Sequence, residues 1–370
     1  MKLEVLQENF SRALSTASRF ASSRAQLPVL GNIYLSAKKN KLLVCSTNLE
    51  VSVAISIGAK VSSEGEITIP SRVISELVVN FTPGAIMLNS EKEILEISSS
   101  NTNSSVSGMN AVDFPEVPQS LGKTSYSFPK EALLQALSQV VFAASTDETR
   151  PILTGVLFLF KKGGLSLVAT DGFRLSQKKL QDAGFHQEKK VILPKSALSE
   201  LARIGIEEQD LKLSFREEDN QVVFGVGDTI LSTRILEGDF PEFEKIIPKE
   251  TNIKVSLDKD DLLRAVKLAS VFARDSANIV RFSLKKDGVV IAAESQMAGR
   301  QESQVEAKVE GLPTGGFEIS FNYRFLEEFL HAVSGGDVNI GLSNENAPGV
   351  FTDPSDVNFL HLIMPVRVQV

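Results

Sequence analysis

Apolar positions along the chain follow two periods, and both periods recur. In three stretches apolar side chains return every three or four residues, which predicts amphipathic helices at residues 10–24, 130–145 and 259–274. The segments that follow each stretch alternate apolar and polar residues between short glycine or basic turns, as half-buried strands do. The pattern predicts an α+β protein in which helices cover one side of antiparallel sheets.

The helix-then-strands pattern occurs three times, at residues 9–53, 130–177 and 259–303. Leu30 aligns with Leu153 and Thr47 with Thr170, both at a spacing of 123 residues. A second helix is predicted in each copy, at residues 71–81, 195–205 and 321–333. Repeats of this length are whole domains. The predicted domains are residues 1–121, 125–248 and 250–370.

Charge is distributed unevenly between the helices and the rest of the chain. The net charge is −7, which by itself argues against a protein that holds nucleic acid tightly. The six predicted helices, however, sum to +5, so the remainder carries −12. A local basic surface acts within a Debye length of about 10 Å, whatever the net charge. The helix faces are therefore candidate nucleic-acid surfaces, although ordinary solvated faces remain an alternative.

The sequence offers no set of residues that predicts an enzyme. Its three histidines, His186, His331 and His361, are far apart and lack metal-ligand spacing. Its one cysteine, Cys45, lies in an apolar strand and is expected to be a small buried side chain. We expect no catalytic residue, metal or cofactor. One cysteine, no signal-peptide pattern and no long apolar run indicate a cytoplasmic protein without a membrane span.

Several longer motifs resemble those of one known family. They are LPVLGN (27–32), VDFPE (112–116), TRPILTGVLF (149–158), VATDGFRL (168–175), DFPEFEKIIPK (239–249) and LIMPVR (362–367). In this order, and across the whole chain, they resemble the bacterial sliding clamps, the β subunits of DNA polymerase III.

The resemblance implies three DNA-clamp domains per chain, each with two helices on antiparallel sheets. Two chains would join head to tail into a ring around duplex DNA, with the helices facing the hole. The implied partners are sequence-independent duplex DNA, a second copy, the polymerase III α subunit, the clamp loader, and other polymerases and repair proteins. Arg24 matches a DNA-contacting position of the family. Weaker candidates come from the basic helix faces: Arg12, Arg19, Arg72, Lys195, Arg203, Arg264 and Lys267.

The resemblance also implies a pocket that receives short linear motifs from partners. Its matching positions are Arg150, Leu153, Thr170, Gly172, Phe173, Arg174, Leu175, Pro241, Lys245, Ile246, Leu362, Ile363, Met364, Pro365, Val366 and Arg367. An apolar surface with methionine and proline walls suits varied extended peptides. Without the resemblance, Leu153, Leu175, Ile246 and Ile363 would be interpreted as core residues.

Some positions depart from the family pattern. Phe173 stands where a histidine is frequent, and Lys245 replaces an arginine. Pro151-Ile152 replaces an aromatic pair, and Gln369-Val370 extends past the usual end. For the ring seam, Val271 and Phe272 match apolar positions, with Val106 expected opposite. Ser104 stands where an aromatic side chain is common.

Two other hypotheses remain open at this level. An enzyme on a threefold scaffold would need an acid, base or metal set, which the sequence does not offer. A peptide-binding adaptor that never encircles DNA would be a monomer at high concentration.

Overall fold

The computed structural model of the chain describes residues 1–22, 27–181, 188–204 and 210–367. Six α-helices lie in these residues, where the sequence predicted six. Their bounds are α1 Gln7–Ala17, α2 Ser71–Val79, α3 Lys130–Val140, α4 Lys195–Arg203, α5 Lys259–Ala273 and α6 Tyr323–Ala332. Helix α1 begins three residues earlier than predicted and continues into a 3-10 turn at Ser18–Phe20.

The three predicted repeats are confirmed by the order of the elements. Each holds a strand, a helix, three strands, another strand, a helix and three more strands. The first repeat contains β1 Lys2–Leu6, β2 Asn32–Lys38, β3 Lys41–Thr47, β4 Val51–Ser63, β5 Gly65–Pro70, β6 Ala85–Glu91, β7 Ile94–Ser98 and β8 Asn103–Ser107. The second contains β9 Ser125–Phe128, β10 Gly155–Lys161, β11 Gly164–Thr170, β12 Arg174–Gln181, β13 Lys189–Pro194, β14 Leu211–Arg216, β15 Gln221–Val226 and β16 Thr229–Arg234. The third contains β17 Ile253–Asp258, β18 Ile279–Lys285, β19 Gly288–Ser295, β20 Gly299–Glu310, β21 Phe317–Asn322, β22 Asp337–Leu342, β23 Gly349–Asp353 and β24 Asp356–Ile363.

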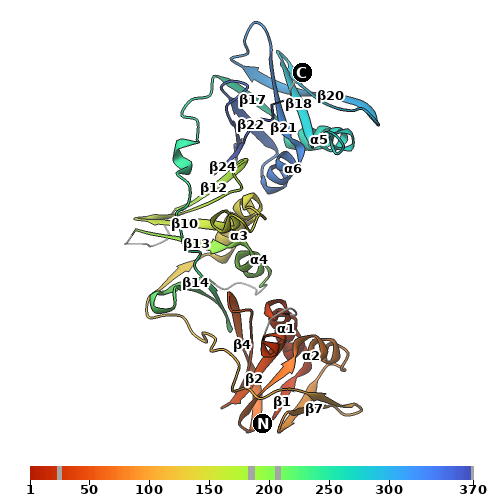
Figure 1. The fold of residues 1–370 in the computed structure, drawn as a ribbon, viewed down its shortest axis with the longest axis vertical. Coiled ribbons are helices and arrows are strands. Elements are labelled where there is room, and N and C mark those ends of the chain that lie inside the picture. Colours follow the sequence, from red (N-terminus) through yellow and green to blue (C-terminus); the bar gives the residue numbers. More distant parts are fainter. Residues whose placement is uncertain (23–26, 182–187, 205–209, 368–370) are drawn as a thin grey trace. The chain divides into compact units, whose positions relative to one another are not determined.

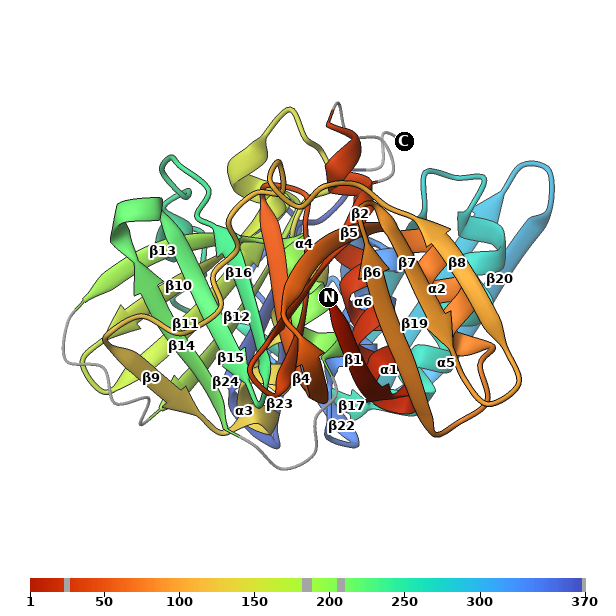
Figure 2. The ribbon, with the colours of Figure 1, turned by 90° about the horizontal axis from the view of Figure 1, so that it is seen from below.

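The contacts group the chain into two compact units, and the middle repeat contributes to both. The N-terminal unit is Met1–Lys130 with Ser196–Ile235, and the C-terminal unit is Glu131–Lys195 with Leu236–Val370. In the N-terminal unit, α1 and α2 lie side by side against the sheet (Figure 1). Strands β1, β6, β7 and β8 run next to one another along that sheet (Figure 2).

The C-terminal unit has its own core beneath α5 and α6. Both helices are capped at their N-termini by the side chain before the first turn. The Asp258 carboxylate accepts hydrogen bonds from the backbone N–H groups of Asp260 and Asp261, and the Asn322 side chain accepts one from Arg324. The buried face of α6 packs Phe329 against Phe351 and Phe359 of the sheet. Cap and apolar face together explain why these residues form helices.

Neighbouring repeats are joined by antiparallel strand pairing within each unit. In the N-terminal unit β4 pairs with β16, and Val51 lies opposite Thr233. In the C-terminal unit β12 pairs with β24, and Arg174 lies opposite Ile363. The two ladders occupy the same place in the repeat, because each joins the fourth strand of one copy to the last strand of the next copy. The same antiparallel pairing therefore joins the first repeat to the second and the second to the third.

Buried polar side chains reinforce the β12–β24 ladder. Lys178 of β12 forms an ion pair with Asp356 of β24, which also accepts a hydrogen bond from Gln139 Nε2 at 2.9 Å. Farther along, Ser176 Oγ lies 2.6 Å from Nδ1 of the fully buried His361. The other ring nitrogen of His361 is buried without a hydrogen-bond partner among the described residues. Such a site favours the neutral ring.

Leu49, in the turn between β3 and β4, has an unusual backbone conformation. Its φ is +76°, in the left-handed region that a side chain with a Cβ atom adopts at a cost of about 1–2 kcal/mol. The side chain is 47% exposed, so it is only partly buried. At the same place in the β11–β12 turn the chain has Gly172, with φ +94°. The strain at Leu49 is therefore local to the first repeat.

We expect the stability of the protein to fall as the pH drops below about 6.5, because of His361. Burial, and secondarily the charge of Arg174, hold the pKa of His361 well below its usual value. The unfolded chain therefore takes up a proton that the folded chain does not, and stability declines by up to about 1.4 kcal/mol per pH unit. Melting temperatures of the wild type and His361→Asn, measured between pH 7 and pH 5, test this. The wild type should lose more stability than the variant, and His331→Gln, a change at an exposed residue, should behave like the wild type.

Leu49→Gly should stabilise the protein. Glycine adopts positive φ without the steric cost, so we expect a gain of about 1 kcal/mol in the free energy of unfolding, or about 2–4 °C in Tm. Leu77→Gly, in the middle of α2 where the backbone is helical, is the control and should destabilise. A lower Tm for Leu49→Gly would contradict the assignment of strain.

Candidate binding surfaces

The β11–β12 turn, Thr170–Leu175, forms the centre of the predicted peptide pocket. Phe173 and Arg174 donate their backbone N–H groups to Oδ1 of Asp171 at 2.9 and 3.0 Å. Thr170 Oγ1 donates to the Arg174 carbonyl at 2.6 Å and accepts from Gly172 N at 3.0 Å. These bonds fix the backbone and leave the Phe173 ring projecting outward, 62% exposed. The turn thus presents an aromatic side chain on a rigid support.

The end of β24 completes this surface. The backbone N–H of Met364 donates to the Phe173 carbonyl at 2.8 Å, and Val366 N donates to the Ser320 carbonyl at 2.8 Å. Met364 is partly exposed, while Leu362 and Ile363 are buried. Phe173 and Met364 are therefore held next to each other by a backbone hydrogen bond that bridges 191 residues.

The predicted pocket residues fall into a buried and an exposed group. Thr170, Arg174, Leu175, Leu362 and Ile363 are buried. Leu175 and Leu362 belong to a small core with Phe243, and Ile363 belongs to the core beneath α6. The core interpretation is therefore confirmed for Leu175 and Ile363 and wrong for Ile246, which is exposed. The exposed residues are Arg150, Gly172, Phe173, Pro241, Lys245, Ile246, Met364 and Arg367, and Leu153, Pro365 and Val366 are half-buried. The exposed group is what a partner could contact.

Arg174 supports the turn from below. Its Nε lies 3.0 Å from Asp171 Oδ2, Nη2 donates to the Phe142 carbonyl at 2.8 Å, and Nη1 forms an ion pair with Glu328. The guanidinium carbon also lies 4.5 Å from the Phe325 ring centroid. With all of its nitrogens engaged, Arg174 orders the pocket and does not offer a free charge to a ligand.

Arg150 and Lys245 remain at the exposed rim. Arg150 pairs with Asp147 at 3.0 Å, and its Nη1 would lie 3.4 Å from a Cβ atom at Gly172. Lys245 forms an ion pair with Glu242. Both pairs are well exposed, so they contribute little and can be exchanged for contacts with a partner.

The predicted DNA-facing residues differ in their availability. Arg24 lies outside the described residues. Four of the others pair with acids: Arg19 with Glu200, Arg72 with Glu76, Arg203 with Glu200 and Arg264 with Asp261. Lys195 is half-buried and donates to the Ala144 carbonyl at 3.2 Å, and burial lowers its pKa. Arg12 and Lys267 are exposed, and no acid in the described part of the chain pairs with either.

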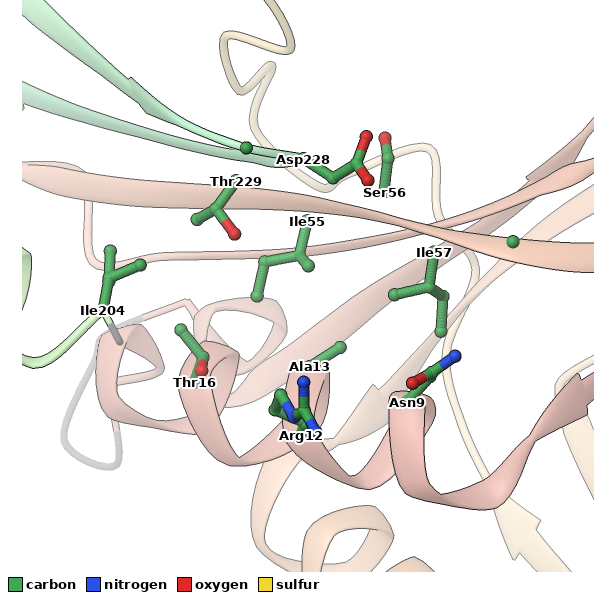
Figure 3. Close-up of a pocket in the computed structure, with 12 residues that line it drawn as sticks. Asn9, Arg12, Ala13, Thr16, Ile55, Ser56, Ile57, Ile204, Asp228 and Thr229 are labelled. Carbon is green, nitrogen blue, oxygen red and sulfur yellow. The ribbon is translucent and has the colours of Figure 1, made fainter. Parts of the chain in front are cut away.

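Arg12 lies at the rim of a cavity of about 510 Å³ in the N-terminal unit. Asn9, Arg12 and Thr16 of α1 line one side, facing Ile55 and Ile57 of β4 (Figure 3). Asp228 of the β15–β16 turn and Thr229 at the start of β16 line another side (Figure 3), and Gly227 also lines the cavity. The cavity places an unpaired guanidinium beside an open, mixed polar and apolar space.

The predicted seam residues also differ in exposure. Val271 of α5 is exposed, Phe272 is half-buried, and Val106 of β8 is buried in the N-terminal unit. Val106 can therefore contribute its backbone to a seam, but its side chain packs inward. The sequence prediction missed Leu268, which is exposed one turn before Val271 on the same face of α5.

Other residues missing from the sequence prediction are the partners of the arginines, Asp147, Asp171 and Glu328. Asp171 could have been found, since Asp-Gly signals a turn and its carboxylate can cap that turn. The pairing of Arg174 with Glu328 spans 154 residues, and no local pattern indicates it.

The described residues contain neither a metal-binding group of side chains nor a membrane-spanning helix. Among the described residues, no three His, Cys, Asp or Glu side chains are grouped so that they could hold a metal. No helix in the same ranges is long and apolar enough to cross a membrane.

Comparison with known proteins covers the whole chain. Models of the DNA polymerase III beta subunit match in order: the N-terminal domain at residues 1–118, the central domain at 127–242 and the C-terminal domain at 244–367. The beta sliding clamp of Synechococcus elongatus is 31% identical over 377 residues, which is 100% of both chains. That of Staphylococcus aureus is 29% identical and covers 99% of each.

Solved structures show the same fold. The DNA polymerase sliding clamp of Bacillus subtilis superimposes with a TM-score of 0.94 at 24% identity, and the beta subunit of Thermotoga maritima with 0.92 at 24%, each over 100% of both chains. The full-length family matches and the 31% identical relative decide the assignment. The chain belongs to the beta sliding clamps, the DNA polymerase III beta subunits, which are non-catalytic processivity factors of DNA replication.

Proposed function

We propose that two copies of the chain close head to tail into a ring around duplex DNA and tether polymerases to it through the Phe173–Met364 surface. The domains of each copy are residues 1–121, 125–248 and 250–370. The ring acts in the cytoplasm, and its partners are the polymerase III α subunit, the clamp loader, and other polymerases and repair proteins that carry short linear motifs.

The observation that carries the ring is the repeated ladder. The fourth strand of the first repeat, β4, pairs with the last strand of the second, and the fourth strand of the second, β12, pairs with the last strand of the third. The strands left over in this series are β20, the fourth strand of the third repeat, and β8, the last strand of the first repeat. Applied once more, the same pairing joins β20 of one copy to β8 of another and closes the series.

The free edges of these two strands fit such a seam. In the described structure β8 pairs only with β7, and the first half of β20 pairs only with β19. Unpaired backbone edges are templates for another strand. Leu268 and Val271 on α5 add apolar area beside the ladder.

Arg12 and Lys267 are the best-supported contacts with DNA. Both lie on exposed helix faces without an acid partner among the described residues, so neither has to break an ion pair to meet a phosphate. Arg24 is kept as a contact on the family resemblance alone. Arg19, Arg72, Arg203 and Arg264 have acid partners and Lys195 is bonded to a carbonyl, so they make weaker contributions. Few and sequence-blind phosphate contacts are what allow a ring to slide.

The Phe173–Met364 surface suits a peptide anchored by an apolar side chain. Phe173, Ile246 and Met364 are exposed apolar side chains, and Arg150, Lys245 and Arg367 are the exposed basic residues among the predicted pocket positions. A motif with an apolar anchor and an acidic flank would match this rim.

Loading onto a closed DNA circle tests the ring. With the clamp loader and ATP present, the protein should stay on nicked circular DNA through a high-salt wash and leave after the circle is cut once. Equal loss from circular and linear DNA, or retention on linear DNA at high salt, would contradict encirclement. A monomer at high protein concentration would favour a peptide-binding adaptor that does not encircle DNA.

Phe173→Ala should weaken the binding of a short polymerase-derived peptide about tenfold or more, as removal of a central aromatic anchor does. Fluorescence anisotropy with a labelled peptide measures the affinity. Val357→Ser is the control, because it removes an even more exposed apolar side chain outside the site. Equal affinities for Phe173→Ala and the control would rule out this surface as the docking site.

A further inference from the structure

The β3–β4 turn of the first repeat copies the backbone of the β11–β12 turn hydrogen bond for hydrogen bond. Glu50 and Val51 donate their N–H groups to Asn48 Oδ1 at 3.1 and 2.8 Å, as Phe173 and Arg174 do to Asp171. Thr47 Oγ1 accepts from Leu49 N at 3.0 Å, as Thr170 Oγ1 accepts from Gly172 N. We call such a hydrogen-bonded turn a platform. The first repeat has one at Thr47–Val51, and the Phe173–Met364 surface has the corresponding one at Thr170–Arg174.

The strand end that borders the platform is also copied. Arg234 N, at the end of β16, donates to the Glu50 carbonyl at 2.9 Å, in the way that Met364 N donates to the Phe173 carbonyl. Both the turn and the strand end lie within the N-terminal unit. What differs between the two platforms is their side chains.

Two exposed leucines mark the platform in the first repeat. Leu49 stands at the position of Gly172, and Leu27, 53% exposed, is offset by the repeat spacing of 123 from Arg150. In the C-terminal unit these two positions are adjacent, since Arg150 Nη1 would lie 3.4 Å from a Cβ atom at Gly172. A strained residue whose apolar side chain faces solvent is a feature that clusters at ligand-binding sites.

Next to the platform lies a cavity of about 250 Å³, lined by Tyr34, Cys45, Phe114, Pro115 and Val117 among others. Cys45 is two residues before Thr47 on β3, so both side chains lie on the same face of the sheet. The positions of Cys45 and Val117 correspond to Val168 and Phe243, which fill a core in the C-terminal unit. Smaller side chains therefore leave space in the first repeat.

The cavity beside this platform is acidic. Glu66 and Glu116 line it, its lining contains no lysine or arginine among the described residues, and Glu50 is exposed in the turn; the exposed basic residue of the platform is Arg234, at the strand end. Tyr34 Oη donates to Glu66 Oε2 at 2.6 Å. At the other site the exposed basic residues are Arg150, Lys245 and Arg367. The cavity is thus suited to an apolar anchor whose neighbours are positively charged.

We propose that the β3–β4 turn and its adjoining cavity form a second docking site, which takes an extended peptide with bulky apolar anchors flanked by lysine or arginine. The inference rests on the proposed function, because the copied platform is argued to be peptide-binding in the C-terminal unit. It extends that function by giving each chain two docking sites of opposite charge preference.

Leu49→Gly tests the site without endangering the fold, since glycine favours the backbone conformation found there. Two labelled ten-residue peptides serve as probes, one alternating Lys or Arg with Leu and Phe, the other with Asp and Glu in place of the basic residues. Anisotropy titrations at two salt concentrations compare the full-length wild type, Leu49→Gly and Phe173→Ala.

The basic peptide should bind the wild type and lose at least fivefold in affinity with Leu49→Gly, while Phe173→Ala leaves it unchanged. Glu116→Gln should weaken it and flatten its salt dependence, and a photoreactive version should label residues 111–117. Unchanged binding to Leu49→Gly, binding lost only with Phe173→Ala, or no binding of the basic peptide would overturn the second site. The acidic peptide reports on the Phe173–Met364 surface, so failure of the proposed function is seen separately.

Discussion

Antiparallel pairing of strand edges between repeats is the constraint on which the rest of the structure depends. A strand edge carries backbone donors and acceptors that must find partners, and in this chain one repeat supplies them to the next. The ladders also fix where side chains meet. Ser176 reaches His361 and Lys178 reaches Asp356 only because β12 and β24 are in this register. The Phe173–Met364 surface exists for the same reason, since its two halves are the ends of paired strands.

The two platforms share one backbone conformation but carry different exposed side chains. The Asn48 amide and the Thr47 hydroxyl hold one turn in shape, and the Asp171 carboxylate and the Thr170 hydroxyl hold the other. These bonds are made to backbone groups of the turn. The outward positions are then unconstrained. One turn presents Phe173, whereas the other presents Leu49 near a cavity lined by two glutamates. Leu49 has a positive φ, which glycine would adopt at lower steric cost, so the residue at this position is not the one that the backbone conformation favours most.

Sequence patterns predicted the parts of the fold that depend on nearby residues. Three helices follow from an apolar period and three from helix-start signals, and the threefold repeat follows from near-constant offsets between aligned residues. Burial of Cys45 followed from its apolar strand. The ladders between repeats, and the ion pair of Arg174 with Glu328, connect residues more than 150 positions apart, so no window of sequence indicates them. Exposed charge was predicted by residue type alone, which is why Arg72 and Arg12 looked alike although only Arg72 has an acid partner among the described residues. The left-handed Leu49 could have been noticed, since its aligned position is a glycine.

The hydrogen bond between Met364 and Phe173 is part of both the β12–β24 ladder and the Phe173–Met364 surface. It continues the β12–β24 ladder beyond its last pair, and it also holds together the two residues that a partner would grip. Mechanical load applied to such a partner therefore passes straight into the backbone of paired strands, without first stretching a flexible loop. An attachment of this kind would be stiff, because the force would be distributed over the backbone hydrogen bonds of the β12–β24 ladder between the second and third repeats.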